Sequence, residues 1–296
     1  MNRLESITKP SITKPMMWLT ALLLAAIVAG CGGTHDGVPS TGGGVGGAGL
    51  GPPPVNLKSI STNNFVILAT TAISEADPVN GKITGNIGNS GAGSAIDVTC
   101  AEMQGTSKIH PTDATYTGSG DTSCAVPTSS LVGPAVLDVG TAYTAASAPA
   151  TPAGVGASNL NLLGGNIPAG TTFAPGTYTW NTPGNVNING DITLTGGPSD
   201  VWIFQMSGNL AVASCSSCSS AADTAAIQVK VGGGAVASNV FWQVAGSSVT
   251  LGTYSTFTGT LLTSPSTLIA IQTGAVLHGR ALSGTSVALD GNTVGP

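Results

Sequence analysis

Small side chains that carry hydroxyl or methyl groups recur at regular intervals between Asn239 and Val294. Threonine is stiff about χ1 and its hydroxyl both donates and accepts hydrogen bonds, so a column of threonines presents both groups in a fixed pattern. On neighbouring strands such a column repeats every ~4.7–4.9 Å, which suits a surface that orders water. The candidate residues are Thr71, Ser74, Thr193, Ser247, Thr250, Thr267, Ala270, Thr285 and Ala288.

Side chains typical of enzyme active sites are sparse. The three histidines, at positions 35, 110 and 278, suggest no Ser-His-Asp arrangement, and the acidic residues are scattered. Glycoside cleavage normally needs paired carboxylates in a cleft. We therefore expect no enzyme, no small-molecule substrate and no cofactor. Trp180, Trp202 and Trp242 are expected in the core, whereas His278 and Arg280 are expected to be solvated.

The element that must position the small side chains is a coil that repeats every 19 or so residues. Apolar residues alternate with small ones, which predicts strands with one buried face, and the repeat predicts a solenoid whose coils stack into sheets. The motif Val201–Gln205 recurs 38 residues later, so we expect the intervening coil to carry an insertion with Cys215 and Cys218. The repeating apolar pairs are Val249 with Leu251, Ile269 with Ile271, and Val287 with Leu289.

The folded domain is expected to span residues 55–296. Strands are predicted at Phe65–Ser74 and Lys82–Gly88. Residues 89–127 show no period and are predicted to be an end cap or an inserted loop, because an open solenoid end exposes unpaired backbone. A helix is predicted over residues 130–147, and it should pack along the solenoid through one apolar stripe. That stripe consists of Val132, Val136, Val139 and Tyr143.

Residues 1–31 resemble a bacterial lipoprotein signal peptide. Basic residues precede an apolar run that ends in Val-Ala-Gly followed by Cys31, the expected lipidation site. Residues 32–54 are rich in Gly and Pro and are predicted to be a tether. We therefore expect an exported protein that is lipid-anchored at the outer membrane or cell surface, with the lipid as its sole contact with the membrane.

The other four cysteines permit three disulfide pairings. Joining Cys100 to Cys124 and Cys215 to Cys218 is the simplest, since each bond closes a local loop. A redox role for the Cys-Ser-Ser-Cys motif is not favoured, because the motif lacks a thioredoxin-like context. A zinc site of four cysteines is not favoured either, because Cys100 and Cys124 lack the close spacing of zinc ligands, so we expect no metal.

The charge balance argues against a nucleic-acid partner. Three of the 8 basic residues and one of the 13 acidic residues lie in the signal peptide, which leaves 5 basic and 12 acidic residues and a net charge of −7. No basic patch is present that could displace counterions from phosphate.

A series of short motifs runs through residues 55–294. They are Phe65-Val-Ile-Leu-Ala, Thr71-Ala-Ile-Ser, Ile83-Thr-Gly-Asn-Ile-Gly, Leu163-Gly-Gly-Asn-Ile, Ala174-Pro-Gly-Thr-Tyr-Thr-Trp, Asp200-Val-Trp-Ile-Phe-Gln, Asn239-Val-Phe-Trp-Gln, Thr273-Gly-Ala-Val-Leu-His-Gly-Arg-Ala-Leu and Val287-Ala-Leu-Asp-Gly-Asn-Thr-Val. Together and in this order they resemble the motifs of the microbial β-solenoid ice-binding (antifreeze) proteins. The resemblance implies a mostly β fold, an irregular right-handed-type β-solenoid of triangular section with one long helix alongside, and a flat face that adsorbs to ice.

In some members the flat face carries a Thr-Ala/Gly-x-Thr/Asn motif in each coil. Residues 71–74 nearly fit this motif, while residues 247–250, 267–270 and 285–288 depart from it, with Ala270 and Ala288 at its last position. The resemblance implies an ice-binding protein whose partner is an ice surface, and which inhibits ice growth or recrystallisation or attaches the cell to ice. The alternatives are a structural or adhesive surface solenoid without ice affinity and, less favoured, a carbohydrate-active enzyme.

Overall fold

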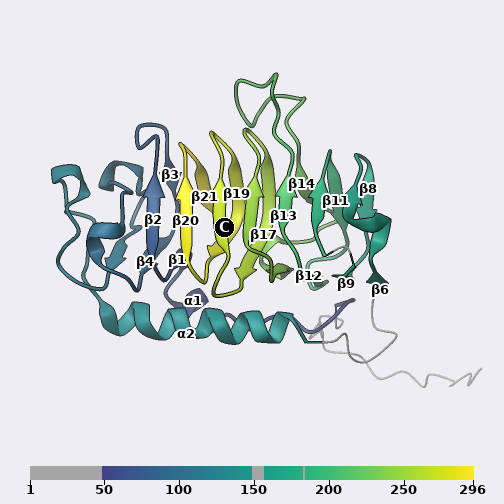
Figure 1. Ribbon diagram of the computed structural model, residues 1–296, viewed down its shortest axis with the longest axis horizontal. Helices are drawn as coiled ribbons and strands as arrows, with labels where there is room; N and C mark the ends of the chain where they lie inside the picture. Colours follow the sequence, from purple (N-terminus) through teal and green to yellow (C-terminus); the bar gives the residue numbers. More distant parts are fainter. Residues whose placement is uncertain (1–48, 149–156, 183) are drawn as a thin grey trace, which may run out of the picture. The chain divides into compact units, whose positions relative to one another are not determined.

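A computed structural model describes residues 49–148, 157–182 and 184–296 (Figure 1). Lipidation of Cys31 and most of the tether lie outside these residues. Within the described part of the chain, no helix is long and apolar enough to span a membrane.

The fold is a solenoid built from three parallel sheets, here named A, B and C. Each coil contributes a strand to successive sheets, so the sheets enclose one core. Sheet A runs in the order β5 (Ile109–Pro111), β4 (Asn86–Asn89), β1 (Phe65–Ala69), β19 (Val276–Leu282), β17 (Thr256–Thr263), β15 (Val240–Val244), β12 (Trp202–Met206), β9 (Gly176–Trp180) and β6 (Ala157–Leu160), and β21 (Thr293–Gly295) with β3 (Lys82–Ile83) extends from β19.

Sheets B and C complete the section. Sheet B runs β2 (Ala72–Glu75), β20 (Ser286–Leu289), β18 (Leu268–Ile271), β16 (Ser248–Leu251), β13 (Leu210–Val212), β10 (Val186–Ile188) and β7 (Asn166–Ile167). Sheet C contains β14 (Val229–Gly232), β11 (Ile192–Thr195) and β8 (Thr171–Phe173). The 3₁₀ turns are η1 (Gly93–Ala95), η2 (Cys100–Glu102), η3 (Gly118–Gly120), η4 (Leu162–Gly165) and η5 (Ala237–Asn239).

The register follows the sequence repeat. Val249 lies beside Ile269, which lies beside Val287, and all three are buried. Gly259 and Gly279 also pair, in the middle of β17 and β19. A Cβ on Gly279 would lie 2.0 Å from the Gly259 carbonyl oxygen, so only glycine allows the coils to stack there.

Aromatic side chains fill the core where sheet A faces inward. Trp180, Trp202 and Trp242 are buried, as predicted. Phe204 stacks on Trp242 with ring centroids 3.9 Å apart, and the Trp242 indole donates to the Thr258 carbonyl at 3.0 Å. The repeat of 38 residues is one enlarged coil, because Gln205 and Gln243 lie side by side in adjacent strands.

The two ends of the domain meet in the sheets, which the sequence did not indicate. Strand β1 pairs with β19, with Ile67 beside Ala281, and β2 pairs with β20, with Ile73 beside Val287. The predicted strand Phe65–Ser74 is wrong as a single element, because the chain turns a corner between β1 and β2. Lys82–Gly88 likewise divides into β3 and β4.

Residues 89–127 lie against the strands of the N-terminal coil. Strand β5 pairs with β4, and isolated bridges join Ile96 to Ile73 and Met103 to Ile83. The Cys100–Cys124 disulfide holds this segment together. The segment therefore extends the core beyond β1 and β2 with short, irregular turns.

Helix α2 (Ser129–Ala146) runs along the length of the solenoid, across the direction of its strands, and packs on sheet A (Figure 1). Its buried side chains are Val132, Ala135, Val139, Ala142 and Ala146. The predicted stripe packs on the solenoid as expected: Val132 and Val139 are buried, and Val136 and Tyr143 are half-buried and pack against the same cluster. The neighbouring turn α1 (Ser59–Thr62) is joined to the helix by an ion pair between Lys58 and Asp138 at 3.5 Å.

Candidate functional site

The outward side of sheet A is not available to a partner along α2. Its outward apolar residues are buried in a cluster with the helix and with the segment that precedes α1. They include Phe65, Leu68, Phe241, Leu262 and Leu282. Two sides of the solenoid, those of sheets B and C, remain open to solvent.

The outward side of sheet B consists of two columns of small or uncharged side chains. Because β16, β18, β20 and β2 are in register, their outward residues lie in line across the sheet. None of these residues is buried and none is charged. We call them the sheet B face: Ala72, Ser286, Leu268 and Ser248 form one column, and Ser74, Ala288, Ala270, Thr250, Ala211, Asn187 and Asn166 form the other.

Four of the predicted site residues meet on this face. Ser74, Ala288, Ala270 and Thr250 occupy consecutive strands of the second column. They come together because each follows a buried residue of its strand, and alternate residues of a strand point to opposite sides.

Thr267 does not lie on the face, and this prediction was wrong. Its side chain is completely buried at the corner before β18, where its hydroxyl bonds to the Ser264 hydroxyl at 2.7 Å and donates to the Gly246 carbonyl. Thr285 occupies the same corner one coil on, and its hydroxyl donates to the Thr267 carbonyl at 2.7 Å. These two threonines therefore join successive coils instead of facing solvent.

Ser247 and Thr71 also lie in corners, before β16 and β2, although both are outside the core. The Ser247 backbone N–H donates to the side-chain oxygen of Asn209 at 2.8 Å. The predicted motif placed two site residues three positions apart on one face. Residues i and i+3 of a strand point to opposite sides, so both can lie outside the core only if one of them is not in the strand. The first residue of each motif is consequently at a turn.

Thr193 belongs to a different side of the molecule, so its grouping with the others was also wrong. It lies in β11 of sheet C, between Thr172 and Lys230. Lys230 forms an ion pair with Asp191 at 3.2 Å, and Lys82 is exposed on β3. The side of sheet C continues to Lys82, because Gln228 before β14 bridges to Thr256, and the first residues of β17, β19, β21 and β3 then pair in turn. This side of the solenoid therefore presents charge, unlike the sheet B face.

Ser248, Leu268 and Ser286 are among the seven residues of the face that were not predicted as site residues. Leu268 is 39% exposed and lies in the middle of its column. The signal that could have found all three was the alternation itself, because each directly precedes a buried residue of its strand.

The Cys215–Cys218 disulfide lies in the insertion between β13 and β14. This loop projects from the edge of the solenoid opposite α2 (Figure 1). Because the insertion joins β13 of sheet B to β14 of sheet C, it projects where these two sheets meet. The nearby residues of the sheet B face remain accessible to solvent.

One pair of carboxyl groups is enclosed beside the end of strand β2. Glu75 accepts N–H groups of Asp77 at 2.8 Å and Gly291 at 2.9 Å through one oxygen. Glu102 accepts the Thr99 N–H at 2.6 Å through one oxygen. The second oxygen of each is buried without any other donor. Burial, together with the negative charge of the nearby Glu75, raises the pKa of Glu102 to about 7.

This pair does not resemble a catalytic or metal centre. A Cβ on Gly81 would approach Glu102 Oε1 to within 2.4 Å, so the space beside the carboxyl is filled. Among the described residues, no three His, Cys, Asp or Glu side chains gather as metal ligands.

Comparison with known proteins gives a consistent result. The model of the Ice-binding-like family matches residues 67–295. An ice-binding protein from Colwellia sp is 38% identical over 247 residues, covering 82% of this chain and 84% of the relative. One from Flavobacterium frigoris is 38% identical over 232 residues, covering 78% of this chain and 73% of the relative.

Solved structures agree with the sequence relatives. An ice-binding protein from an Arctic yeast, described for its antifreeze activity, matches with a TM-score of 0.66 and 29% identity, covering 82% of this chain and 94% of that one. An ice-binding protein from the Antarctic ascomycete Antarctomyces psychrotrophicus matches with a TM-score of 0.63 and 28% identity, covering 82% and 98%. With its sequence, its β-solenoid and its single long helix all in agreement, the chain belongs to the ice-binding-like protein family.

Proposed function

We propose that the protein adsorbs to ice through the sheet B face and does so without catalysis. The observation that carries this proposal is the contrast between the three sides. Helix α2 covers sheet A, the side of sheet C carries Lys82 and Lys230, and the sheet B face is both accessible and uncharged.

The chemistry of the face suits an ordered water layer. Columns repeat every ~4.8 Å across the sheet and every ~7 Å along each strand, so hydroxyl and methyl groups form a fixed array. Hydroxyls such as that of Thr250 can donate and accept, while the methyls of Ala270 and Ala288 order neighbouring water without bonding to it. A charged group would instead orient water around itself. Water held by the array merges with a growing crystal, and the bound protein then pins the ice front.

The four strands from β16 to β2 are the proposed centre of adsorption. At the other end of the second column, Asn187 donates to the side-chain oxygen of Asn166 at 3.2 Å, so these amides are already paired along the solenoid. The N-terminal strand β2 completes the centre, because Ala72 and Ser74 continue both columns past β20.

A double substitution, Thr250→Tyr with Ala270→Tyr, tests the proposal on protein produced from Gly32 onward. Two adjacent phenol rings would stand above the array, so ice shaping and recrystallisation inhibition should fall at least about tenfold, the effect of losing roughly 1.4 kcal/mol of adsorption free energy. The melting temperature should change little, since both side chains point to solvent.

The matched control is Thr172→Tyr with Thr193→Tyr, which places the same rings on adjacent strands of sheet C. This variant should retain full activity. Loss of activity in the control, with activity retained in the sheet B variant, would move the site to sheet C.

A structural or adhesive role without ice affinity is the second candidate function. The exposed Leu268, and alanines where a threonine motif would have hydroxyls, favour it. A folded protein, shown by circular dichroism, that neither shapes ice nor slows recrystallisation would establish this alternative.

We also propose that the domain is exported and held at the cell surface by a lipid on Cys31, as the signal sequence indicates. Such a position would let it protect or attach a whole cell. Incorporation of a fatty-acid label, lost in Cys31→Ser, is the expected result. Equal labelling of both proteins would refute the anchor.

A further inference from the structure

Arg280 has an environment that the proposed adsorption to ice does not explain. The sequence predicted a solvated side chain, but the structure places it half-buried on β19, where its Nε–H donates to the Phe65 carbonyl at 3.0 Å. It is the one arginine in the sequence after Arg3. Burial also lowers the pKa of its guanidinium, which shows that part of its hydration has been removed.

No carboxylate in the described residues neutralises this charge. The ion pairs there join Lys58 to Asp138 and Lys230 to Asp191. A guanidinium has five N–H donors, and Nε uses one of them, so the two terminal nitrogens have donors without a protein acceptor. The two terminal nitrogens are not among the fully buried polar atoms, so they remain open to water or to a bound ligand.

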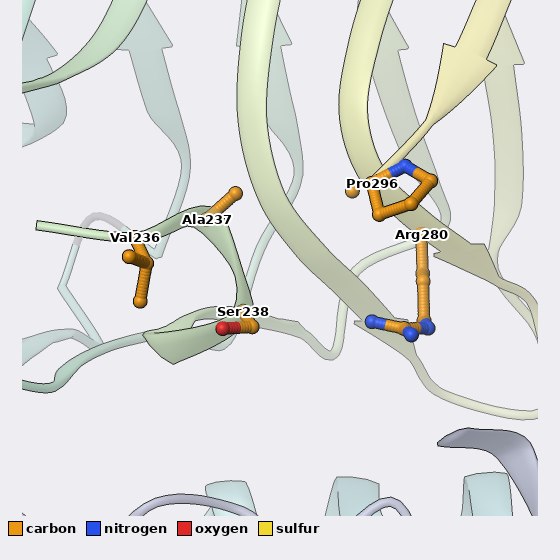
Figure 2. A pocket seen from close by; sticks show the side chains of 6 residues that line it. Val236, Ala237, Ser238, Arg280 and Pro296 are labelled. Atoms are coloured by element: carbon orange, nitrogen blue, oxygen red, sulfur yellow. The ribbon is translucent and has the colours of Figure 1, made fainter. Parts of the chain in front are cut away.

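Two hollows meet at Arg280. One of about 220 Å³ is lined by Val236, Ala237, Ser238, Gly279, Arg280 and Pro296 (Figure 2). Figure 2 shows that the guanidinium end of the Arg280 side chain points away from Pro296. Ser238 lies across the hollow from this end. A second hollow, of about 520 Å³, shares Ser238 and Arg280 and has an apolar wall that includes Pro54, Val55 and Phe241.

A hydroxyl that lines both hollows faces the arginine. Ser238 is exposed and belongs to the lining of each hollow, as Arg280 does. A serine hydroxyl can donate a hydrogen bond to the oxygen of an anion held by the guanidinium.

We propose that the hollow at Arg280 binds a small oxyanion, a phosphate or carboxylate, by its free guanidinium donors and the Ser238 hydroxyl. The planar guanidinium offers two parallel N–H groups to such a ligand. The adjoining hollow, with Pro54, Val55 and Phe241, has room for an organic group that carries the anion.

Selective labelling makes the test direct. In protein produced from Gly32 onward, Arg280 is the sole arginine, so ¹⁵N-arginine labelling gives a single Nε–Hε signal. That signal should shift saturably with sodium phosphate and stay unmoved by sodium chloride at equal ionic strength. Glycerol phosphate and acetate serve as further probes, and tighter binding of glycerol phosphate than of phosphate identifies an organic ester as the preferred form.

Variants distinguish a specific site from a general salt effect. Calorimetry should show phosphate affinity reduced about tenfold or more in Arg280→Gln and also reduced in Ser238→Ala, where the loss of one exposed hydroxyl leaves the fold intact. Lys230→Gln removes one positive charge from a remote ion pair and should leave affinity unchanged. A signal that responds equally to chloride, or equal affinity in Arg280→Gln and the unmodified protein, overturns the proposal.

Discussion

Replacing Glu102 by glutamine should remove a loss of stability that the unmodified protein suffers between about pH 4.5 and 7. The pKa of Glu102 is raised from 4.5 to about 7 by burial and by the neighbouring Glu75. Below pH 4.5 the carboxyl is protonated in both folded and unfolded chains, so it has no effect on stability. As pH rises towards 7, the unfolded chain ionises first, and the free energy of unfolding falls.

The magnitude follows from the size of the shift. A change from 4.5 to about 7 corresponds to roughly 3 kcal/mol, the upper limit of the stability lost by pH 7 and above. The substitution Glu102→Gln removes the titration, because the new amide nitrogen can donate to Glu75 and the amide oxygen can still accept the Thr99 N–H.

Urea unfolding followed by circular dichroism at intervals from pH 4.5 to 8 measures the effect. The unmodified protein should lose up to about 3 kcal/mol across this range, whereas Glu102→Gln should be nearly flat. Asp97→Asn is the matched control, since Asp97 is an exposed acid in the same segment, and it should follow the unmodified protein. Parallel profiles for Glu102→Gln and the unmodified protein would show that the pKa of Glu102 is not raised in the folded protein.

Acid-side titrations do not interfere with this window. Hydrogen bonds lower the pKa of five aspartates from 3.8, so the stability that they contribute is lost as pH falls below that value. They are Asp77, Asp113, Asp121, Asp138 and Asp223.

Thr267→Val should destabilise the fold by about 1–3 kcal/mol in urea unfolding, because it leaves buried acceptors unpaired; an unchanged midpoint would contradict the corner role of this hydroxyl. Opening the Cys100–Cys124 loop with serines should cost about 3 kcal/mol, whereas opening Cys215–Cys218, which spans only three residues, should cost less and leave ice activity unchanged; equal costs for the two would show that loop length does not control the effect.

The sequence was most informative where structure depends on neighbours in the chain. Alternation around Val249, Ile269 and Val287 predicted strands, and the recurrence of this pattern predicted the register in which these residues stack. Both follow from the period of two in a strand and from the need to bury one side of every coil. The helix was predicted to within a residue at each end for the same reason.

The candidate site was only partly predictable. Thr250, Ala270 and Ala288 were identified correctly as neighbours on one surface. Thr267 was not, because nothing in its own sequence shows that the chain turns a corner there and encloses the hydroxyl. Local composition does not distinguish a threonine that faces solvent from one that bonds to the next coil.

Thus the sequence by itself determined the coils, their inward residues and the scarcity of charge on their outer sides. Only the tertiary structure decided which side of the solenoid is open, since that depends on where α2 packs. It also decided that β2 completes the sheet B face, through contacts such as that of Thr70 with Gly284, which are 214 residues apart. Contacts between such distant segments depend on how all the coils close together, and no local pattern of residues specifies them.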